Sequence, residues 1–132
     1  MKTRNVALII FYDKQKRILL QDRKGISKVG EEWGFFGGEI DDGETPEEAI
    51  LRETKEELNF DLKQYKYIGD NNFKFNNLFI KCKIFISPLK DISEFRQKEG
   101  QNLKLFSLKE AKNLKMVSKG DIKTLDILNK SL

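Results

Sequence analysis

Apolar and polar residues follow two different periods along this chain, and the changes between them outline a mixed α/β domain. Residues 5–12 form a near-continuous apolar run, as expected of a buried central strand. Residues 17–23 follow a short polar turn and complete a predicted hairpin. A period of two returns later in the chain and indicates a strand whose apolar face carries Ile80, Cys82, Ile84 and Ile86.

The period changes to that of a helix after residue 45. Thr45 is a suitable N-cap, Pro46 suits the first helical position, and Glu48 completes a capping box. No glycine or proline interrupts the pattern up to about Leu58. One side of this helix is expected to be buried and carries Ile50, Leu51, Thr54 and Leu58. A separate arc is acidic and carries Glu53, Glu56 and Glu57.

The remaining segments predict a second group of strands and two C-terminal helices. Residues 61–69 are predicted as a strand, 70–72 as a turn, 73–86 as extended with a break at 76–77, 88–96 as a loop, and 103–106 as a strand. Ser107 and Glu110 form a second capping box. A final helix is expected from Ser118 or Asp121, with an apolar side of Ile122, Leu125, Ile127 and Leu128.

Length and composition support a single folded domain spanning residues 1–132. The chain is 39% hydrophobic and has ten phenylalanines, enough for a core. Its one cysteine, Cys82, excludes an internal disulfide and favours a reducing compartment. The apolar run at 6–11 is too short for a membrane span. We therefore expect a cytoplasmic protein without a membrane partner, either monomeric or homodimeric.

Charge is distributed unevenly. Residues 31–57 hold eleven acidic residues against two basic ones, whereas the rest of the chain is strongly basic. An acidic pocket in a basic body suits a site that holds a cation and receives a polyphosphate, although scattered lysines also serve solubility. There is no clustered basic arm, so nucleic-acid binding is disfavoured. The chain has no histidine, so histidine-based nucleophile activation and histidine metal ligands are excluded.

The acidic face of the predicted helix requires a physical explanation. Like charges three or four positions apart destabilise a helix by roughly a few tenths of a kcal/mol per pair. A bound divalent cation would reverse this cost, and Mg²⁺ prefers one or two carboxylates together with waters and phosphates. The alternative is a solvated acidic face, which is common in a chain with 35% charged residues.

The spacing around the acidic face favours the metal-site hypothesis. Gly38 is followed after five residues by Glu44 and after seven more by Arg52-Glu-Thr-Lys-Glu-Glu-Leu-Asn-Phe60. This pattern resembles the Nudix box, the signature of the Nudix hydrolases, and matches each of its charged positions. Thr54 stands where an aliphatic residue is usual, and Asn59 where glycine is usual. Asparagine tolerates the left-handed conformation that ends a helix, so Asn59 can replace the glycine.

The resemblance implies a fold, an activity and a metal. The fold would be the Nudix fold, an α/β/α sandwich with a mixed β-sheet. The activity would be that of a pyrophosphohydrolase, which cleaves a nucleoside diphosphate linked to another group, with Mg²⁺ or its substitute Mn²⁺ as cofactor. The absence of histidine argues against the isopentenyl-diphosphate isomerase relatives of this fold. The partner would be a small nucleotide substrate.

The resemblance also assigns roles to individual residues. The expected metal ligands and catalytic acids are Glu53, Glu56, Glu57 and Glu99, with Glu94 as the reserve for Glu99, and the carbonyl of Gly37 as a further metal ligand. The expected substrate contacts are Arg23, Phe35, Gly37 and Gly38, where Phe35 has core packing as an alternative role. Arg52 is expected to be structural, paired with Glu48 or Glu56 one turn away and, by resemblance, with Glu44.

The substrate is predicted by elimination. ADP-ribose hydrolases of this family often carry a proline, and dinucleoside-polyphosphate hydrolases a tyrosine, in the segment after the box. Residues 75–78 contain neither. A nucleoside triphosphate, oxidised or otherwise non-standard, is therefore the favoured substrate. The alternatives are hydrolysis of ADP-ribose or another nucleotide sugar, and a Nudix module that senses a nucleotide without hydrolysing it.

Overall fold

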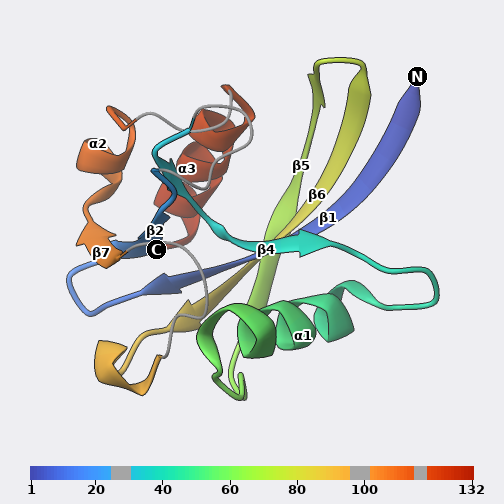
Figure 1. The fold of residues 1–132 in the computed structure, drawn as a ribbon. Helices are drawn as coiled ribbons and strands as arrows, with labels where there is room; N and C mark the ends of the chain where they lie inside the picture. The colour runs from blue at the N-terminus through green and yellow to red at the C-terminus, as the bar shows by residue number, and fades with distance from the viewer. Residues whose placement is uncertain (25–30, 96–101, 115–118) are drawn as a thin grey trace.

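Helices pack against one mixed sheet in the computed structural model of this protein, which describes residues 1–24, 31–95, 102–114 and 119–132 (Figure 1). In chain order the elements are β1 (Lys2–Tyr12), β2 (Ile18–Asp22), β3 (Trp33–Gly34), β4 (Phe36–Glu39), α1 (Pro46–Leu58), β5 (Lys66–Phe75), β6 (Leu78–Pro88), the 3₁₀ turn η1 (Ile92–Glu94), β7 (Leu103–Phe106), α2 (Leu108–Ala111) and α3 (Lys119–Ser131).

Strand β1 is the centre of the sheet. The strand order is β3-β2-β1-β6-β5, with β4 paired to β1 and β7 paired to β2. β1 runs parallel to β6 and antiparallel to β2 and β4. Its apolar run is mostly buried from Ala7 to Phe11, which confirms the predicted central strand and the hairpin that follows it. The strand begins earlier than expected, at Lys2, and its first residues are exposed.

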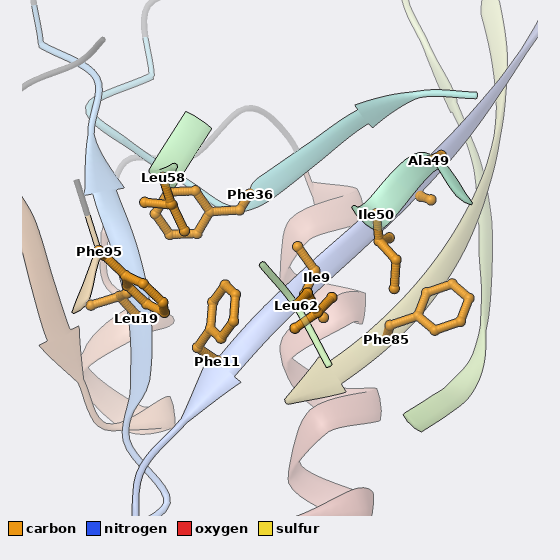
Figure 2. Close-up of a cluster of buried hydrophobic side chains, with 11 residues drawn as sticks. Ile9, Phe11, Leu19, Phe36, Ala49, Ile50, Leu58, Leu62, Phe85 and Phe95 are labelled. Carbon is orange, nitrogen blue, oxygen red and sulfur yellow. The ribbon is translucent and has the colours of Figure 1, made fainter. Parts of the chain in front are cut away.

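The two faces of the sheet carry separate hydrophobic cores. Figure 2 shows the core under α1, where Ile9 and Phe11 of β1 meet Phe36 of β4 and Ile50 of the helix. The second core joins β1, β2 and β6 to Leu125 and Leu128 of α3. With helices on both faces of a mixed sheet, the predicted α/β/α architecture is confirmed (Figure 1). In the ranges that the structure describes, no helix is long and apolar enough to cross a membrane.

Two apolar helix positions differ from the prediction. Leu51 of α1 was expected on the buried side but has 37% of its surface exposed, and Ile122 of α3 has 44% exposed. Both lie at the margins of apolar stripes whose centres are buried, because a helix on a sheet buries only the part of its circumference that faces the strands.

Helix α1 begins and ends as its sequence predicts. The Thr45 hydroxyl accepts a hydrogen bond from the Glu48 N–H, and the Glu48 carboxylate accepts one from the Thr45 N–H. Asn59 takes the left-handed conformation, with φ 51° and ψ 40°, and its N–H donates to the Lys55 carbonyl. The asparagine therefore ends the helix in place of the glycine that is usual at this position of the box.

The predicted turn at residues 70–72 is wrong. These residues lie inside β5, and residues 61–65, expected to be part of a strand, precede it. The chain turns instead at Asn76, with φ 54°, where only a break in the extended segment was expected. The prediction followed the local composition, since Asp and Asn usually mark turns. In the structure Asn71 is buried against α3, and Asp70 lies opposite Lys83 of β6.

Candidate active site

Two adjacent glycines bring the backbone of β4 against β1 and α1. Gly37 has φ 130°, and a Cβ at this position would lie 2.2 Å from the Ala7 carbonyl oxygen. A Cβ on Gly38 would lie 2.7 Å from Oε1 of Glu53. The Gly37 N–H also donates to Oε2 of Glu57 at 3.4 Å. Any side chain here would separate β4 from β1 or from the carboxylates of α1.

Glu53 and Glu57 form a carboxylate pair beside these glycines. Burial raises the pKa of Glu57 to about 8, and the nearby charge of Glu53 adds to this rise. Burial also raises the pKa of Glu53, against the opposing effect of Arg52. Two half-buried acids at one place are unfavourable when both are ionised. A divalent cation would remove this penalty, so the donor set fits Mg²⁺, which needs only one or two carboxylates from the protein.

Arg52 links Glu53 of this pair to Glu44 and to the backbone of β4. Its Nε and Nη2 donate to the two oxygens of Glu44 at 2.8 and 2.9 Å, and its Nη1 donates to Oε1 of Glu53 at 2.8 Å. Nη2 also donates to the Glu39 carbonyl at 3.0 Å. The hydrogen bond from Arg52, followed by that from the Asp41 N–H, lowers the pKa of Glu44 to about 2. These contacts are those of a structural arginine.

Of the two partners expected one turn away from Arg52, the structure shows a contact with Glu56 only, among the interactions that it describes. Glu56 lies 3.4 Å from Nη1 and has 60% of its side chain exposed, whereas Glu48 closes the capping box with Thr45. Glu56 is therefore largely exposed and shares the Arg52 Nη1 with Glu53. Across the part of the chain that the structure describes, no three acidic, histidine or cysteine side chains are grouped as a metal site.

A cavity of about 370 Å³ opens beside the carboxylate pair. It is lined by five of the predicted residues, which the structure thereby brings together: Arg23, Phe35, Gly37, Gly38 and Glu57. Phe35 also packs against the core under α3, so both of its predicted roles remain compatible with its position. Glu99 lies outside the described residues.

Arg23 is held in this cavity by two neighbours. Its Nε donates to Oε2 of Glu31 at 3.2 Å, and the Glu31 side chain is only 6% exposed. The arginine also crosses Gly34, where a Cβ would lie 2.7 Å from the Arg23 Cδ. The positive charge of Arg23 is close enough to lower the pKa of Glu57, in opposition to the burial effect. The side chain is thus an oriented cation facing the carboxylate site.

Three polar residues are among the cavity residues that were not predicted from the sequence. Gln21 is almost fully buried, and its amide donates to the Phe35 carbonyl at 3.2 Å. Glu31 orients Arg23, and Asp121 enters from the first turn of α3. A glutamine inside the apolar strand 18–21 was a usable signal for Gln21. The sequence held no comparable signal for Asp121, because only the folded topology brings α3 to this cavity.

Glu94, the reserve candidate for Glu99, lies in a different place. It lines a second hollow of about 490 Å³ formed by the segments after α1 and after β6. Phe60 and Phe95 contribute to this hollow, with ring centroids 4.9 Å apart. The structure therefore does not bring Glu94 into the cavity that Glu57 lines.

Comparison with known proteins places this architecture in one family. The NUDIX domain model matches residues 1–126. An 8-oxo-dGTP diphosphatase from Proteus vulgaris is 32% identical over 85 residues, which are 64% of this chain and 76% of that protein. An RNA pyrophosphohydrolase from a Nitratiruptor species is 43% identical over 60 residues, which are 43% of this chain and 37% of that protein.

The fold is shared with solved structures as well. The crystal structure of the MutT protein from Methanosarcina mazei Go1 superposes with a TM-score of 0.81 at 15% identity and covers 98% of this chain and 95% of that one. At this identity the likeness shows the fold alone. The domain match and the named relatives confirm the interpretation as a Nudix pyrophosphohydrolase acting on nucleotides. This chain belongs to the Nudix hydrolase family.

Proposed function

We propose that this protein hydrolyses a nucleoside triphosphate to a nucleoside monophosphate and pyrophosphate, with Mg²⁺ as its metal and Mn²⁺ as a substitute. The observation that carries the proposal is the cavity in which Arg23, Glu57 and the backbone of Gly37 and Gly38 meet. Arg23 supplies one positive charge, and Glu57 offers a ligand for a metal cation in the same cavity. Two positive charges in one cavity suit a polyphosphate. The 8-oxo-dGTP diphosphatase relative supports an oxidised nucleotide as the first candidate substrate.

Each charged group has a defined task in this reaction. Glu53 and Glu57 would hold the metal, with Glu56 turning inward as a third ligand and the Gly37 carbonyl as a further one. Bound there, Mg²⁺ would neutralise charge on the phosphates and acidify a coordinated water. Arg23, oriented by Glu31, binds phosphate oxygens from the other side of the cavity. Arg52 and Glu44 keep the helix carboxylates in register.

The chemical step is the addition of water to phosphorus. A P–O bond forms between the water oxygen and one phosphorus, the bridging P–O bond of the anhydride breaks, and the bridging oxygen leaves with pyrophosphate. The proton released from water passes to a carboxylate, for which Glu99 is our candidate, and then to solvent. A carboxylate is our candidate for the proton acceptor because the chain has no histidine, the commonest general base.

The nucleoside end of the substrate fits the remaining wall of the cavity. Val6, Leu8 and Ile80 provide an apolar surface, and Phe35 provides an aromatic ring. Asp121 adds a carboxylate that can accept hydrogen bonds from the N–H groups of a base. Small-molecule sites are usually lined by apolar and aromatic side chains with a few polar groups, and this lining suits a planar base with a polar edge. The tail of phosphates would then extend towards Arg23 and Glu57.

Hydrolysis of a panel of nucleotides tests the proposal. The panel holds normal and oxidised nucleoside triphosphates, ADP-ribose, diadenosine polyphosphates and a short RNA with a 5′-triphosphate, each assayed with Mg²⁺ and with or without added pyrophosphatase. Release of pyrophosphate from a nucleoside triphosphate, lost with EDTA, is the expected result. Preference for ADP-ribose or for RNA would replace the substrate. Binding without turnover of any compound would support the sensing module instead.

A further inference from the structure

The first turn of α3 is fixed to the edge strand β5 by a buried side-chain amide. Asn71 is 4% exposed and its Nδ2 donates to the Gly120 carbonyl at 2.7 Å and to the Thr124 hydroxyl at 3.2 Å. The Thr124 hydroxyl donates in turn to the Gly120 carbonyl at 3.3 Å. Buried hydrogen bonds of this kind fix relative positions, because breaking one leaves unpaired polar groups in the core.

A close packing contact adds to this attachment. A Cβ on Gly120 would lie 2.7 Å from three ring atoms of Phe73, so the ring of this β5 residue lies directly on the helix backbone. Glycine is required here by proximity, since no positive φ is involved. Asn71 and Phe73 both point to the α3 face of the sheet, where their partners in β6 are Cys82 and Ile80. Strand β5 therefore contacts the first turn of α3 through Asn71 and Phe73, which lie on the same face of the strand.

The residue that follows Gly120 is Asp121, which lines the cavity described above. Ile80, the partner of Phe73 across the β5–β6 hairpin, lines the same cavity. The attachment of α3 to β5 is thus continuous with one wall of the substrate site. We propose that Asn71 is a positioning residue for substrate binding, which holds Asp121 at the cavity by fixing the first turn of α3. The proposal rests on the proposed function for its ligand, a nucleoside triphosphate.

The variant Asn71→Leu tests this role, because leucine has a similar volume and lacks the amide. We expect KM for the preferred triphosphate to rise about 10-fold while kcat changes less than about 3-fold, since binding and not the carboxylate chemistry is disturbed. Hydrogen exchange of the amides at 122–126 should accelerate in the same variant. Thr124→Val, which loses one partner and keeps its shape, should show smaller changes in the same directions.

Ser87→Ala is the matched control. Ser87 is also 4% exposed, and its hydroxyl donates to the Gln64 carbonyl at 2.6 Å, on the α1 side of β6. Its loss removes a similarly buried hydrogen bond without touching α3, so stability should fall while KM stays at the wild-type value. If Asn71→Leu behaves like Ser87→Ala, with lower stability and unchanged KM, the positioning role is overturned.

A double-mutant cycle identifies the residue through which Asn71 acts. In an Asp121→Ala background, Asn71→Leu should leave KM within about 2-fold of the single Asp121 variant, because the positioned carboxylate is already absent. Full additivity of the two effects overturns the proposal. If the wild type neither binds nor hydrolyses any nucleotide of the panel, the proposed function fails. Hydrogen exchange of the amides at 122–126 then tests separately whether Asn71 fixes the first turn of α3. An unchanged exchange rate in Asn71→Leu contradicts that role.

Discussion

Glu44 and Glu57 belong to the same sequence box but occupy opposite electrostatic environments. Glu44 accepts two hydrogen bonds from Arg52 and one from the Asp41 N–H, and its pKa falls to about 2. Glu57 is held beside Glu53 in a half-buried position, and its pKa rises to about 8. Glu44 accepts its hydrogen bonds from Arg52 and Asp41, whereas Glu57 accepts one long hydrogen bond from the Gly37 N–H and lies beside a second carboxylate.

This difference separates the frame of the site from its working groups. A carboxylate that already accepts three hydrogen bonds, two of them from an arginine, stabilises the fold and has little capacity left for a ligand. A carboxylate pair kept together against its own repulsion is costly to the fold and available to a cation. We therefore expect the same residue type to have two purposes at two positions of one box, and each can be tested by removing its charge.

The largest effect is expected for Glu57→Gln. This change keeps the shape of the side chain and removes a negative ligand, so kcat should fall by about 10²-fold or more at saturating Mg²⁺ and nucleotide. Glu44→Gln, in which the amide can still accept a hydrogen bond from Arg52, should lose about 10-fold or less. Steady-state rates of both variants under one set of conditions check the contrast. Equal losses would mean that the frame and the working pair are not distinct.

Arg52→Lys should have the next largest effect. Lysine keeps the charge but cannot contact both oxygens of Glu44, Glu53 and the Glu39 carbonyl at once. We expect a loss of about 10-fold in kcat/KM together with a weaker apparent affinity for Mg²⁺, because Glu53 is no longer oriented. Titration of activity with Mg²⁺ measures both. Wild-type values in the lysine variant would show that charge alone is sufficient.

The pH dependence of stability should separate the two acids without any substrate. In metal-free protein Glu57 has a raised pKa, so the folded state holds a proton that the unfolded state loses above its ordinary pKa of 4.5. The free energy of unfolding should therefore fall as pH rises from about 4.5 to 8. Glu44 has a lowered pKa, so its contribution is present above 4.5 and disappears as pH falls towards 2.

Urea denaturation in EDTA at several pH values measures this pattern. Glu57→Gln cannot titrate, so it should be more stable than the wild type at pH 8, and the difference should narrow towards pH 5. Saturating Mg²⁺ should reverse the order, because only the wild type keeps the full metal site. Parallel curves for the two proteins across this range would contradict the raised pKa of Glu57.

The smallest effect is expected at Thr54, on the buried side of α1. Within the described residues, its Oγ1 is the one buried side-chain nitrogen or oxygen without a hydrogen-bond partner. Thr54→Val has nearly the same shape and removes this polar atom, so the protein should gain about 1 kcal/mol in its free energy of unfolding. The kcat should not change. Urea denaturation of the variant checks the gain, and a loss of stability would show that the hydroxyl has a partner in solution.

Local sequence was sufficient for the elements whose determinants are local. The capping box of Thr45 and Glu48, the left-handed Asn59 and the alternation around Cys82 all have their causes within a few residues, and each is confirmed. The prediction for residues 70–72 was wrong because Asp and Asn usually mark turns. Here Asn71 is stabilised in a strand by a helix that lies about fifty positions further along the chain.

The working parts of the site could be predicted only in part, for the same reason. Charge spacing along α1 indicated that its acids were functional and that Arg52 was structural. The spacing could not show that Glu56 is largely exposed and shares a nitrogen of Arg52 with Glu53, because that depends on where Arg52 reaches in three dimensions. Glu31 and Asp121 enter the cavity from separate elements, so no local pattern connects them to the box.

The parallel pairing of β1 with β6 has a consequence for the order in which the protein folds. Helix α1 and the β5–β6 hairpin need only neighbouring residues, whereas the β1–β6 ladder joins the first strand to a strand that follows α1 and completes the hairpin. Contacts between distant residues form slowly, because a long loop must close first. On a ribosome, β1 must wait for β6 to emerge before its central place in the sheet is complete. Any metal affinity of the α1 carboxylates should therefore appear only after β6, which ends at Pro88, has left the exit tunnel.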